Sequence, residues 1–400
     1  MQVETRHWPT LHEKPDGSLT LAVGEGVTGA VVRALAEGVT PPRPFSVRAF
    51  RPLPPPPPGE RAITVDQTNH SVIAGESVVV KWFPRPSRAP HPAPDLLAHL
   101  SGFSRTATPY AAVYWEDALV ALITAYLPEA RDGWEWCVDE AEAGRTAFAA
   151  ELGGLAADLH LAMATPSPVF PDPVRLARAV PEQDPEQDPE QDPTHGSTGG
   201  AASAAGAWAA RAEEALRDAL TLTDGEDGAW LASRAEALRH ELAPLATAGA
   251  TPLIRIHGDL HVGQILRWRD GYAVVDFDGN PTVSGSAPGG GAFQPAARDL
   301  AQLTTSVDHV GQVAILRRNA DPDRIAEWVA ASRAAIEGAY AAGLADAGRA
   351  DLLDRSLIRP FEIEQECREL IYAARHLPRW RYAPMGVLRT WFGAGPAFTK

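Results

Sequence analysis

Two aspartates and one amide have the spacing most suited to chemistry in this 400-residue chain. Asp259 and Asp276 stand 17 positions apart, each at the end of an apolar run, and Gln264 comes five positions after the first of them. Phosphoryl transfer from a nucleotide needs such groups, because a carboxylate must accept or orient the attacking hydroxyl and oxygen ligands must hold the Mg²⁺ that bridges the phosphates. The amide oxygen of Gln264 and the carboxylate of Asp276 are suitable ligands for that ion.

The same segments resemble the catalytic and metal-binding loops of the aminoglycoside phosphotransferase-like kinases, which are relatives of protein kinases. Residues 257–266 read HGDLHVGQIL and residues 274–279 read VVDFDG, most similar to the HGDLHLGQ and DFEGEP of the bacterial maltokinase-like branch. The resemblance covers roughly residues 62–160 and 208–385, and it is strong only in the two loops. It implies an α+β, bilobal protein-kinase-like fold, with ATP as the phosphate donor and a sugar hydroxyl as the acceptor.

The resemblance also implies a role for each residue of the loops. Asp259 would be the catalytic base, in contact with the acceptor, and Gln264 and Asp276 would bind Mg²⁺. Asp278 stands where the branch has a glutamate, and would hold a second metal ion or order the loop. An HGD tripeptide alone would indicate only a turn with a capping aspartate. The amide five positions later and the DFDG segment argue against that interpretation and favour a catalytic loop. Asp299, in a segment that also matches the family, is expected to brace the catalytic loop.

Lys81 is expected to bind the nucleotide. Only three lysines occur among the 36 basic residues, and arginine would replace a lysine wherever positive charge alone was needed. In the kinases that the chain resembles, a lysine on a strand of the small lobe neutralises the α- and β-phosphates. Its acidic partner would be Asp95 or, less simply, Glu76. The alternative is an exposed edge-strand lysine that discourages aggregation.

Backbone groups are expected to make the other contacts with the nucleotide. No GxGxxG loop precedes Lys81, so the resemblance implies that the amides from Gln67 to Ser71 cover the phosphates. Adenine would lie against Ala125, Tyr126 and Leu127, where backbone groups can pair with the base edge.

The acceptor is predicted from a helical segment near the C-terminus. Residues 361–372 resemble the substrate helix of the maltokinases, but Gln365 replaces a lysine, Glu366 an alanine and Arg368 a tyrosine. The candidate sugar contacts are Asp308, Glu362, Glu366, Glu369 and Tyr372.

Three of these candidates, Glu362, Glu366 and Glu369, share one helix face at spacings of four and three. Like charges on one face repel, so the helix gains from a bound cation or from arginine partners. A protonated amino sugar is such a cation, and the loss of aromatic surface disfavours a second glucose ring. The alternative is a solvated acidic face that pairs with Arg368 and Arg375.

These observations favour a kinase that converts glucosamine to glucosamine 6-phosphate, because the chain resembles the glucosamine kinases of this group in its DFDGNP segment and its acidic helix. A maltokinase that makes maltose 1-phosphate, or an aminoglycoside phosphotransferase, is the alternative. An inactive kinase fold that serves as a binding module is the non-enzyme alternative, against which the joint retention of Lys81, Asp259, Gln264 and Asp276 argues.

Composition agrees with a globular enzyme that acts on a small molecule. The chain is 45% hydrophobic and 22% charged, with a net charge of -15 that argues against nucleic acid or an anionic membrane as a partner. Two cysteines cannot form a disulfide framework, and no apolar run reaches the length of a membrane span. With a polar start in place of a signal peptide, these features predict a cytoplasmic protein, a monomer or weak dimer.

Pattern and composition predict three regions. Residues 1–60 form an N-terminal cap, residues 61–126 a β-rich part of the small lobe, and residues 127–400 a helical lobe with the catalytic and substrate site. Residues 181–206 contain a repeated Glu-Gln-Asp-Pro unit, for which a mobile loop is expected because proline in every unit excludes helix and strand.

Local patterns then predict the elements that position the candidate residues. The expected strands are Leu19–Val23, Ala30–Leu35, Ala62–Val65, Val78–Phe83, Ala111–Tyr114, Ala118–Tyr126, Leu253–Ile256 and Tyr272–Phe277. The expected helices are Asp95–Leu100, Arg145–Ala164, Trp208–Leu242, Asp323–Leu344 and Pro360–His376.

Overall fold

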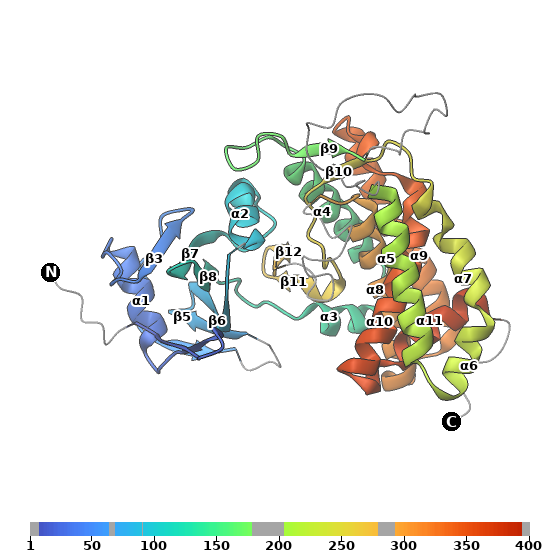
Figure 1. Cartoon of the computed structure of the whole chain (residues 1–400), viewed down its shortest axis with the longest axis horizontal. Coiled ribbons are helices and arrows are strands. Elements are labelled where there is room, and N and C mark those ends of the chain that lie inside the picture. Colours follow the sequence, from blue (N-terminus) through green and yellow to red (C-terminus); the bar gives the residue numbers. More distant parts are fainter. Residues whose placement is uncertain (1–7, 64–68, 90, 178–203, 279–292, 394–400) are drawn as a thin grey trace, which may run out of the picture. The chain divides into compact units, whose positions relative to one another are not determined.

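The chain folds into two compact units (Figure 1). The computed structural model describes residues 8–63, 69–89, 91–177, 204–278 and 293–393. The N-terminal unit comprises Met1–Asp132, Ser167–Pro171 and Ile265–Asp278, and the helical unit comprises Gly133–Pro166, Asp172–Gln264 and Gly279–Lys400. One unit is rich in β-strands and the other is mainly helical, so the predicted α+β bilobal fold is confirmed.

A six-stranded antiparallel sheet forms the centre of the N-terminal unit, in the order β3-β7-β8-β6-β5-β4. Its strands are β3 (Phe45–Ala49), β4 (Glu60–Ala62), β5 (His70–Ala74), β6 (Val78–Arg88), β7 (Pro109–Trp115) and β8 (Ala118–Ala125). A separate hairpin of β1 (Thr10–Glu13) and β2 (Leu19–Ala22) and two helices, α1 (Val27–Ala36) and α2 (Pro92–His99), complete this part of the unit.

The alternation of side chains along β6 places Lys81 on the face opposite the hydrophobic core. Val78, Val80 and Trp82 are buried in a cluster with residues of α1, β7 and β8. Because successive side chains of a strand point to opposite faces, Val79 and Lys81 lie on the other side of the sheet. Lys81 pairs with Leu122 on the neighbouring strand, in a regular part of the ladder.

The first 60 residues differ from the sequence prediction in two respects. Ala30–Leu35 is part of helix α1 and not a strand, because Thr28, Val31 and Val32 bury one face at helical spacing. The sheet also continues across the boundary predicted at residue 60, since β3 pairs with β7 along its whole length. Val65, at the end of another expected strand, lies outside the described residues.

A second hairpin, β11 (Ile265–Trp268) and β12 (Gly271–Val274), belongs to the N-terminal unit although it follows the catalytic loop in the sequence. The Thr106 hydroxyl donates to the Val274 carbonyl at 2.7 Å, and Ala273 packs with Ala107 and Leu127. These contacts fix the start of the segment that carries Asp276.

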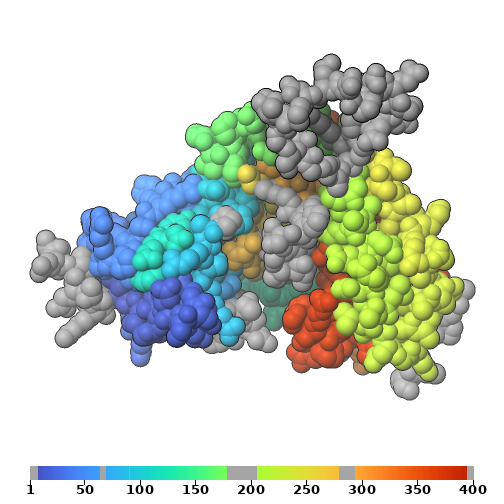
Figure 2. Space-filling view, in the orientation of Figure 1, coloured from blue at the N-terminus to red at the C-terminus, as the bar shows by residue number. Residues whose placement is uncertain are grey.

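The helical unit is built from long helices joined by short connections. Its elements are α3 (Gly133–Ala143), α4 (Ala147–Met163), β9 (Val174–Leu176), α5 (Ala204–Leu222), α6 (Gly225–Ser233), α7 (Ala235–Leu242), β10 (Pro252–Ile254), α8 (Ala297–Arg318), α9 (Pro322–Asp346), α10 (Ile358–Arg375) and α11 (Tyr382–Phe392). Helix α10 packs against α5 and α8, and α9 packs against α4 and α8 (Figure 1). Residues of α5 to α7 form much of this unit's surface in Figure 2, where they are yellow-green to yellow.

Three predicted helices of this unit are confirmed with shifts of one to a few residues at their ends, and a fourth is divided. The helical pattern predicted for Trp208–Leu242 is divided among α5, α6 and α7: α5 ends at Leu222, and α6 begins at Gly225, whose φ of 65° suits the turn between the two helices. Most of the repeat insert predicted at residues 181–206 lies outside the described residues. Among the residues that are described, no helix has the length and apolar character that crossing a bilayer requires.

Helix α4 packs closely against α9, where Gly153 and Ala157 of α4 face Ala339 and Gly343 of α9. Phe148, Leu152, Leu155 and Leu159 are buried, as the sequence spacing predicts. Gly153 sits where α4 approaches α9 so closely that a Cβ atom would lie 2.2 Å from the carbonyl oxygen of Ile336.

We therefore expect Gly153→Ala to destabilise the helical unit. Alanine has the higher helix propensity by up to ~1 kcal/mol, but overpacking a core costs about 1–3 kcal/mol or more, and the contact here is with rigid backbone. Denaturant unfolding should show the loss. Gly338→Ala is the matched control, because Gly338 is exposed on α9 with open space around it; this change should leave the free energy of unfolding unchanged or raise it. Equal effects of the two substitutions would contradict the packing argument.

Candidate functional site

The N-terminal unit contains a cavity of about 400 Å³ around Lys81. The sheet contributes Ser71, Val79, Lys81 and Leu122, and the segment after β12 contributes Val275–Asp278. The cavity wall is mostly apolar, with a few charged groups at one place, which is typical of a site for a small ligand with a polar end.

Lys81 makes two ion pairs inside this cavity. Its Nζ lies 2.6 Å from Asp276 Oδ1 and 2.5 Å from Asp278 Oδ2. Burial disfavours the ammonium, but the two carboxylates outweigh it and raise the pKa of Lys81. Burial and the neighbouring Asp276 raise the pKa of the Asp278 carboxyl against the effect of Lys81. Asp276 has a φ of 66°, a left-handed conformation that is uncommon outside glycine and is often found at functional sites.

The predicted acidic partners of Lys81 are engaged elsewhere, which corrects the sequence prediction. Asp95 lies in the first turn of α2 and pairs with Arg48 at 2.6 Å. Glu76 pairs with Arg61, also at 2.6 Å. The acids that contact Lys81 come instead from a segment almost 200 positions away, so no local pattern around Lys81 could identify them.

Part of the backbone of the predicted adenine segment is already hydrogen-bonded. The N–H of Ala125 donates to the Thr108 carbonyl at 2.8 Å, and the N–H of Tyr126 donates to the Ser77 carbonyl at 2.9 Å. Within the described part of the chain, Leu127 has no such backbone partner for its N–H. All three residues line the cavity. Gln67, the predicted phosphate contact, lies outside the described residues.

The acids around Lys81 suit a magnesium ion bound together with phosphates. Asp276 and Asp278 both reach one ammonium group, so their oxygens converge on a common point. Nowhere in the described ranges do three or more His, Cys, Asp or Glu side chains gather as a self-sufficient metal site. Magnesium usually takes one or two carboxylates plus water and substrate phosphates, and this is the kind of ligand set that these two residues offer.

The helical unit contains a second cavity, of about 530 Å³, next to Asp259. The residues that line it are Trp134, Val138, Asp259, His261, Gln302, Ser306, His309, Val313, Arg317, Gln365, Arg368, Glu369, Tyr372, Leu377, Arg379 and Trp380. Aromatic rings form one part of the wall: Trp134 stacks on His261 with centroids 5.6 Å apart and makes a T-shaped contact with Trp380. Such rings suit the apolar face of a sugar.

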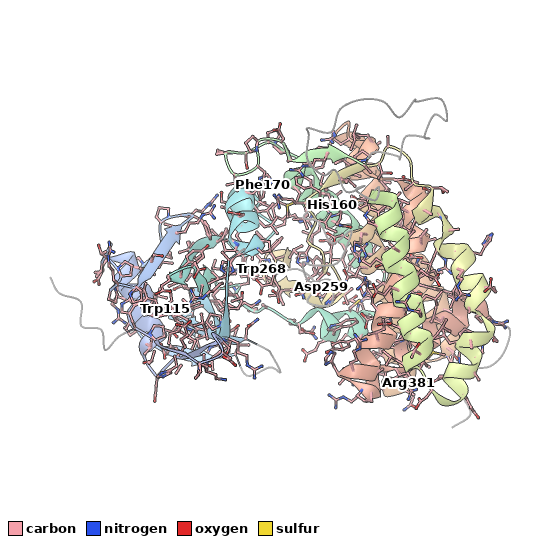
Figure 3. All side chains as sticks on the ribbon, in the orientation of Figure 1. Trp115, His160, Phe170, Asp259, Trp268 and Arg381 are labelled. Atoms are coloured by element: carbon pink, nitrogen blue, oxygen red, sulfur yellow. The ribbon has the colours of Figure 1, made fainter. Side chains whose placement is uncertain are left out.

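The loop that carries Asp259 is held by Asp299, as predicted. The backbone N–H groups of His257 and Gly258 donate to the two oxygens of Asp299, at 2.8 and 2.9 Å. Gly258 has a φ of 81°, which explains the glycine of this motif. His160 Nε2 lies 3.1 Å from Asp299, and its other ring nitrogen contacts the hydroxyl of Tyr340. Figure 3 labels His160 and Asp259.

The carboxylate of Asp259 faces the cavity and has 18% of its side chain exposed. The amide of Gln302 donates to Oδ1 at 2.7 Å, whereas Oδ2 lies 3.5 Å from the Gln264 amide and 3.7 Å from His261 Nε2. Burial alone would raise the pKa of the Asp259 carboxyl, but His261, Gln302 and the nearby His257 lower it. Gln302 was missed by sequence reasoning, and its position one turn after Asp299 was the available signal.

Two of the predicted sugar contacts are engaged with an arginine away from the cavity. Asp308 and Glu362 are both buried, and both pair with Arg333 of α9. Neither lines the cavity of the helical unit. The acidic residues of α10 are thus partly explained by arginine partners: Arg333 pairs with Glu362, and Arg368, one of the two predicted arginines, pairs with Glu364 at 2.7 Å.

Glu366 is fully buried behind the cavity wall. It contacts His309 Nε2 at 3.1 Å, and His309 in turn lines the cavity. Burial raises the pKa of Glu366 to about 7. Burial would lower the pKa of His309, but the Glu366 carboxylate outweighs it and the pKa is raised to about 9. The Glu366 carboxylate therefore has its ionisable partner behind the cavity wall and not in the cavity.

Glu369 has a different environment, because it lines the cavity without a cationic partner. Trp380 Nε1 donates to one of its oxygens at 2.8 Å, and the Gln365 amide donates to the other at 2.9 Å. No ion pair of Glu369 occurs among the residues described in the structure, whereas Glu362, Glu364 and Glu366 on the same helix all contact a cationic or ionisable partner. Tyr372, one turn later, lines the same cavity and is 40% exposed.

Comparisons with known proteins identify the family of the chain. Residues 61–279 match the phosphotransferase enzyme family. A glucosamine kinase from Streptacidiphilus jiangxiensis is 37% identical over 94% of this chain and 83% of its own, and one from Mycolicibacterium smegmatis is 35% identical over 82% of this chain and 79% of its own.

Two solved glucosamine kinase structures are also similar over 96% of this chain. One, in complex with glucosamine, ADP and inorganic phosphate, is 34% identical with a TM-score of 0.73 and 87% of its chain covered. The other, a second crystal form, is 33% identical with a TM-score of 0.76 and 91% covered. The family match extends over more than half of the sequence and includes Lys81, Asp259, Gln264 and Asp276. The chain therefore belongs to the phosphotransferase enzyme family.

Proposed function

We propose that this chain is an ATP-dependent glucosamine kinase that phosphorylates the 6-hydroxyl group of the sugar. The similarity to glucosamine kinases over almost the whole chain supports the reaction and its substrates. The observation that carries the choice of acceptor is Glu369, a carboxylate that lines the cavity beside Asp259 and is held only by neutral donors. An ammonium group is the natural partner of such a carboxylate.

In the proposed reaction Asp259 is the general base. Its carboxylate accepts the proton of the acceptor hydroxyl as the hydroxyl oxygen forms a bond to the γ-phosphorus, and the bond from that phosphorus to the β–γ bridging oxygen breaks to release ADP. Asp299 and Gln302 keep the base in place.

The groups of the N-terminal cavity are proposed to bind ATP. Lys81 would neutralise the α- and β-phosphates, and Leu127, with a free backbone N–H within the described residues, would pair with adenine. Asp276 and Asp278, together with Gln264, would hold Mg²⁺, which when bound neutralises charge on the phosphates. Lys81 would then exchange part of its contact with the two acids for the phosphates.

The acceptor alternatives fit the charges of α10 less well. Maltose has no ammonium group to compensate Glu369. An aminoglycoside has several, yet on the described part of α10 only Glu369 lacks a cationic or ionisable partner. An inactive binding module would not need Lys81, Asp259, Gln264 and Asp276 together. We further propose that the protein acts in the cytoplasm as a monomer or weak dimer, with no nucleic acid or membrane partner.

One assay separates these alternatives. ATP consumption should be measured with glucosamine, glucose, maltose and kanamycin as acceptors, each at several concentrations. We expect glucosamine to give the highest kcat/KM. A preference for maltose or kanamycin would reject the proposed acceptor, and no turnover with any acceptor would favour the binding module.

Asp259→Asn should lower kcat for glucosamine by about two to four orders of magnitude, the usual contribution of a general base. The KM for ATP should change by less than about threefold, because the substitution does not touch the nucleotide cavity. Steady-state kinetics checks both values. Asp270→Asn removes the same charge from an exposed position of the β11–β12 turn and should turn over normally. Normal turnover of Asp259→Asn would remove Asp259 as the base.

Glu369→Gln should raise the KM for glucosamine about 10- to 100-fold, because a hydrogen bond to a charged group contributes about 1.5–3 kcal/mol. The KM for glucose, which has no ammonium, should change little, so the ratio between the two sugars is the measurement. Glu366→Gln is the comparison variant: it disturbs the contact with His309 behind the wall, and should affect both sugars alike. If Glu366→Gln changed the ratio and Glu369→Gln did not, the ammonium site would have been assigned to the wrong glutamate.

A further inference from the structure

Three polar residues of α8 form a stripe that follows the catalytic loop. Asp299, Gln302 and Ser306 are spaced by three and four positions, so they share one face of the helix. Asp299 accepts the first two N–H groups of the loop, Gln302 donates to the carboxylate of Asp259, and Ser306 Oγ accepts the N–H of Val262 at 3.0 Å. The helix thus contacts the loop at its start, at its functional side chain and at its end.

The Gln302 contact differs from the other two because it acts on a side chain and not on backbone. A carboxylate can only accept hydrogen bonds when ionised, so the Gln302 atom that lies 2.7 Å from Oδ1 is the NH₂ group. Gln302 is only 6% exposed and sits on a helix packed on several sides, so its amide has little freedom to turn away. The orientation of the Asp259 carboxylate is therefore set by α8.

The two oxygens of Asp259 are consequently not equivalent. Oδ1 has a short bond to Gln302, whereas the neighbours of Oδ2, Gln264 and His261, lie 3.5 and 3.7 Å away. A group at 3.7 Å is too distant for a hydrogen bond, and one at 3.5 Å is at the limit. Oδ2 therefore retains the capacity to accept a further, stronger hydrogen bond.

We propose that Gln302 is a positioning residue for the transfer reaction: it holds Oδ1 and leaves Oδ2 as the oxygen that takes the proton from the acceptor hydroxyl. This inference rests on the proposed function, in which Asp259 is the base. The proton moves from the hydroxyl to Oδ2 as the hydroxyl oxygen forms a bond to the γ-phosphorus and the bond from that phosphorus to the β–γ bridging oxygen breaks, which releases ADP. The hydrogen bond from Gln302 to Oδ1 remains throughout. Gln302 neither gains nor loses a proton.

The test compares Gln302→Met, Gln302→Glu and Gln312→Met. Methionine keeps the length of glutamine without its donor, and glutamate keeps the shape but places a like charge beside Asp259. Gln312→Met is the matched control, because Gln312 is a buried glutamine of the same helix that does not line the cavity. Kinetics with ATP and glucosamine, thermal unfolding, and crystal structures of wild type and Gln302→Met are measured.

We expect Gln302→Met to lower kcat by about 10- to 100-fold, as misplacement of a reacting group does, with both KM values within about threefold of wild type. Gln302→Glu should lose more activity, and Gln312→Met should keep the wild-type kcat. A merely structural role would instead lower the melting temperature of Gln302→Met and Gln312→Met alike and leave kcat per folded molecule unchanged, which would overturn the proposal.

The crystal structures test, without any substrate, whether Gln302 sets the orientation of the Asp259 carboxylate. In Gln302→Met the Asp259 carboxylate should turn, while the backbone of residues 257–262 keeps its position. An unturned carboxylate would overturn the inference even if kcat fell. Absence of wild-type activity on glucosamine would overturn the proposed function instead, and the orientation of the carboxylate would still test whether Gln302 sets it.

Discussion

The hydrogen bonds from the backbone N–H groups of His257 and Gly258 to Asp299 are the contact on which the rest of the helical site depends. Asp299 is completely buried, and a buried carboxylate is tolerated only when donors surround it. Two backbone amides and His160 supply them, and Tyr340 fixes the other side of the imidazole ring. Helices α4, α8 and α9 therefore meet at one carboxylate, so the position of Asp259 follows from the packing of the helices.

A second constraint is the distribution of charge along α10. Glu364 lies among Arg211, Arg298 and Arg368, and although burial opposes ionisation, these arginines lower the pKa of its carboxyl well below the usual range. Removing either side of such a buried cluster leaves an uncompensated charge, so these residues hold α10 against α5 and α8. Among the described residues, cationic or ionisable partners compensate Glu362, Glu364 and Glu366 of this helix but not Glu369. The charge left over faces the cavity, where a substrate can compensate it.

The sequence allowed prediction of those parts of the site that are local in the chain. The spacing of Asp259 and Gln264 within one loop, the DFDG segment and the rarity of lysine identified the chemistry, because each is visible in a few adjacent residues or in composition. The partners of Lys81 were predicted wrongly, since they come from a hairpin far along the sequence that packs into the N-terminal unit. Likewise, the fold reveals that Arg333 pairs with Asp308 and Glu362, and that Gln302, for which the position one turn after Asp299 was the available sequence signal, reaches Asp259. Long-range pairing, and not local propensity, decided each of these cases.

The pair of His309 and Glu366 shows why a charged residue next to a cavity need not be a ligand of the substrate. Glu366 is completely buried, so a substrate in the cavity cannot reach its carboxylate. The charge of that carboxylate is compensated by His309, which is buried beside it. Burial raises the pKa of the Glu366 carboxyl, and the Glu366 carboxylate raises the pKa of His309 against the effect of burial, so the two groups titrate as a pair. The His309 ring makes a T-shaped contact with the indole of Trp380, which also donates to Glu369. The buried pair thus supports the indole that orients Glu369, so α10 places one glutamate behind the cavity wall and another on it.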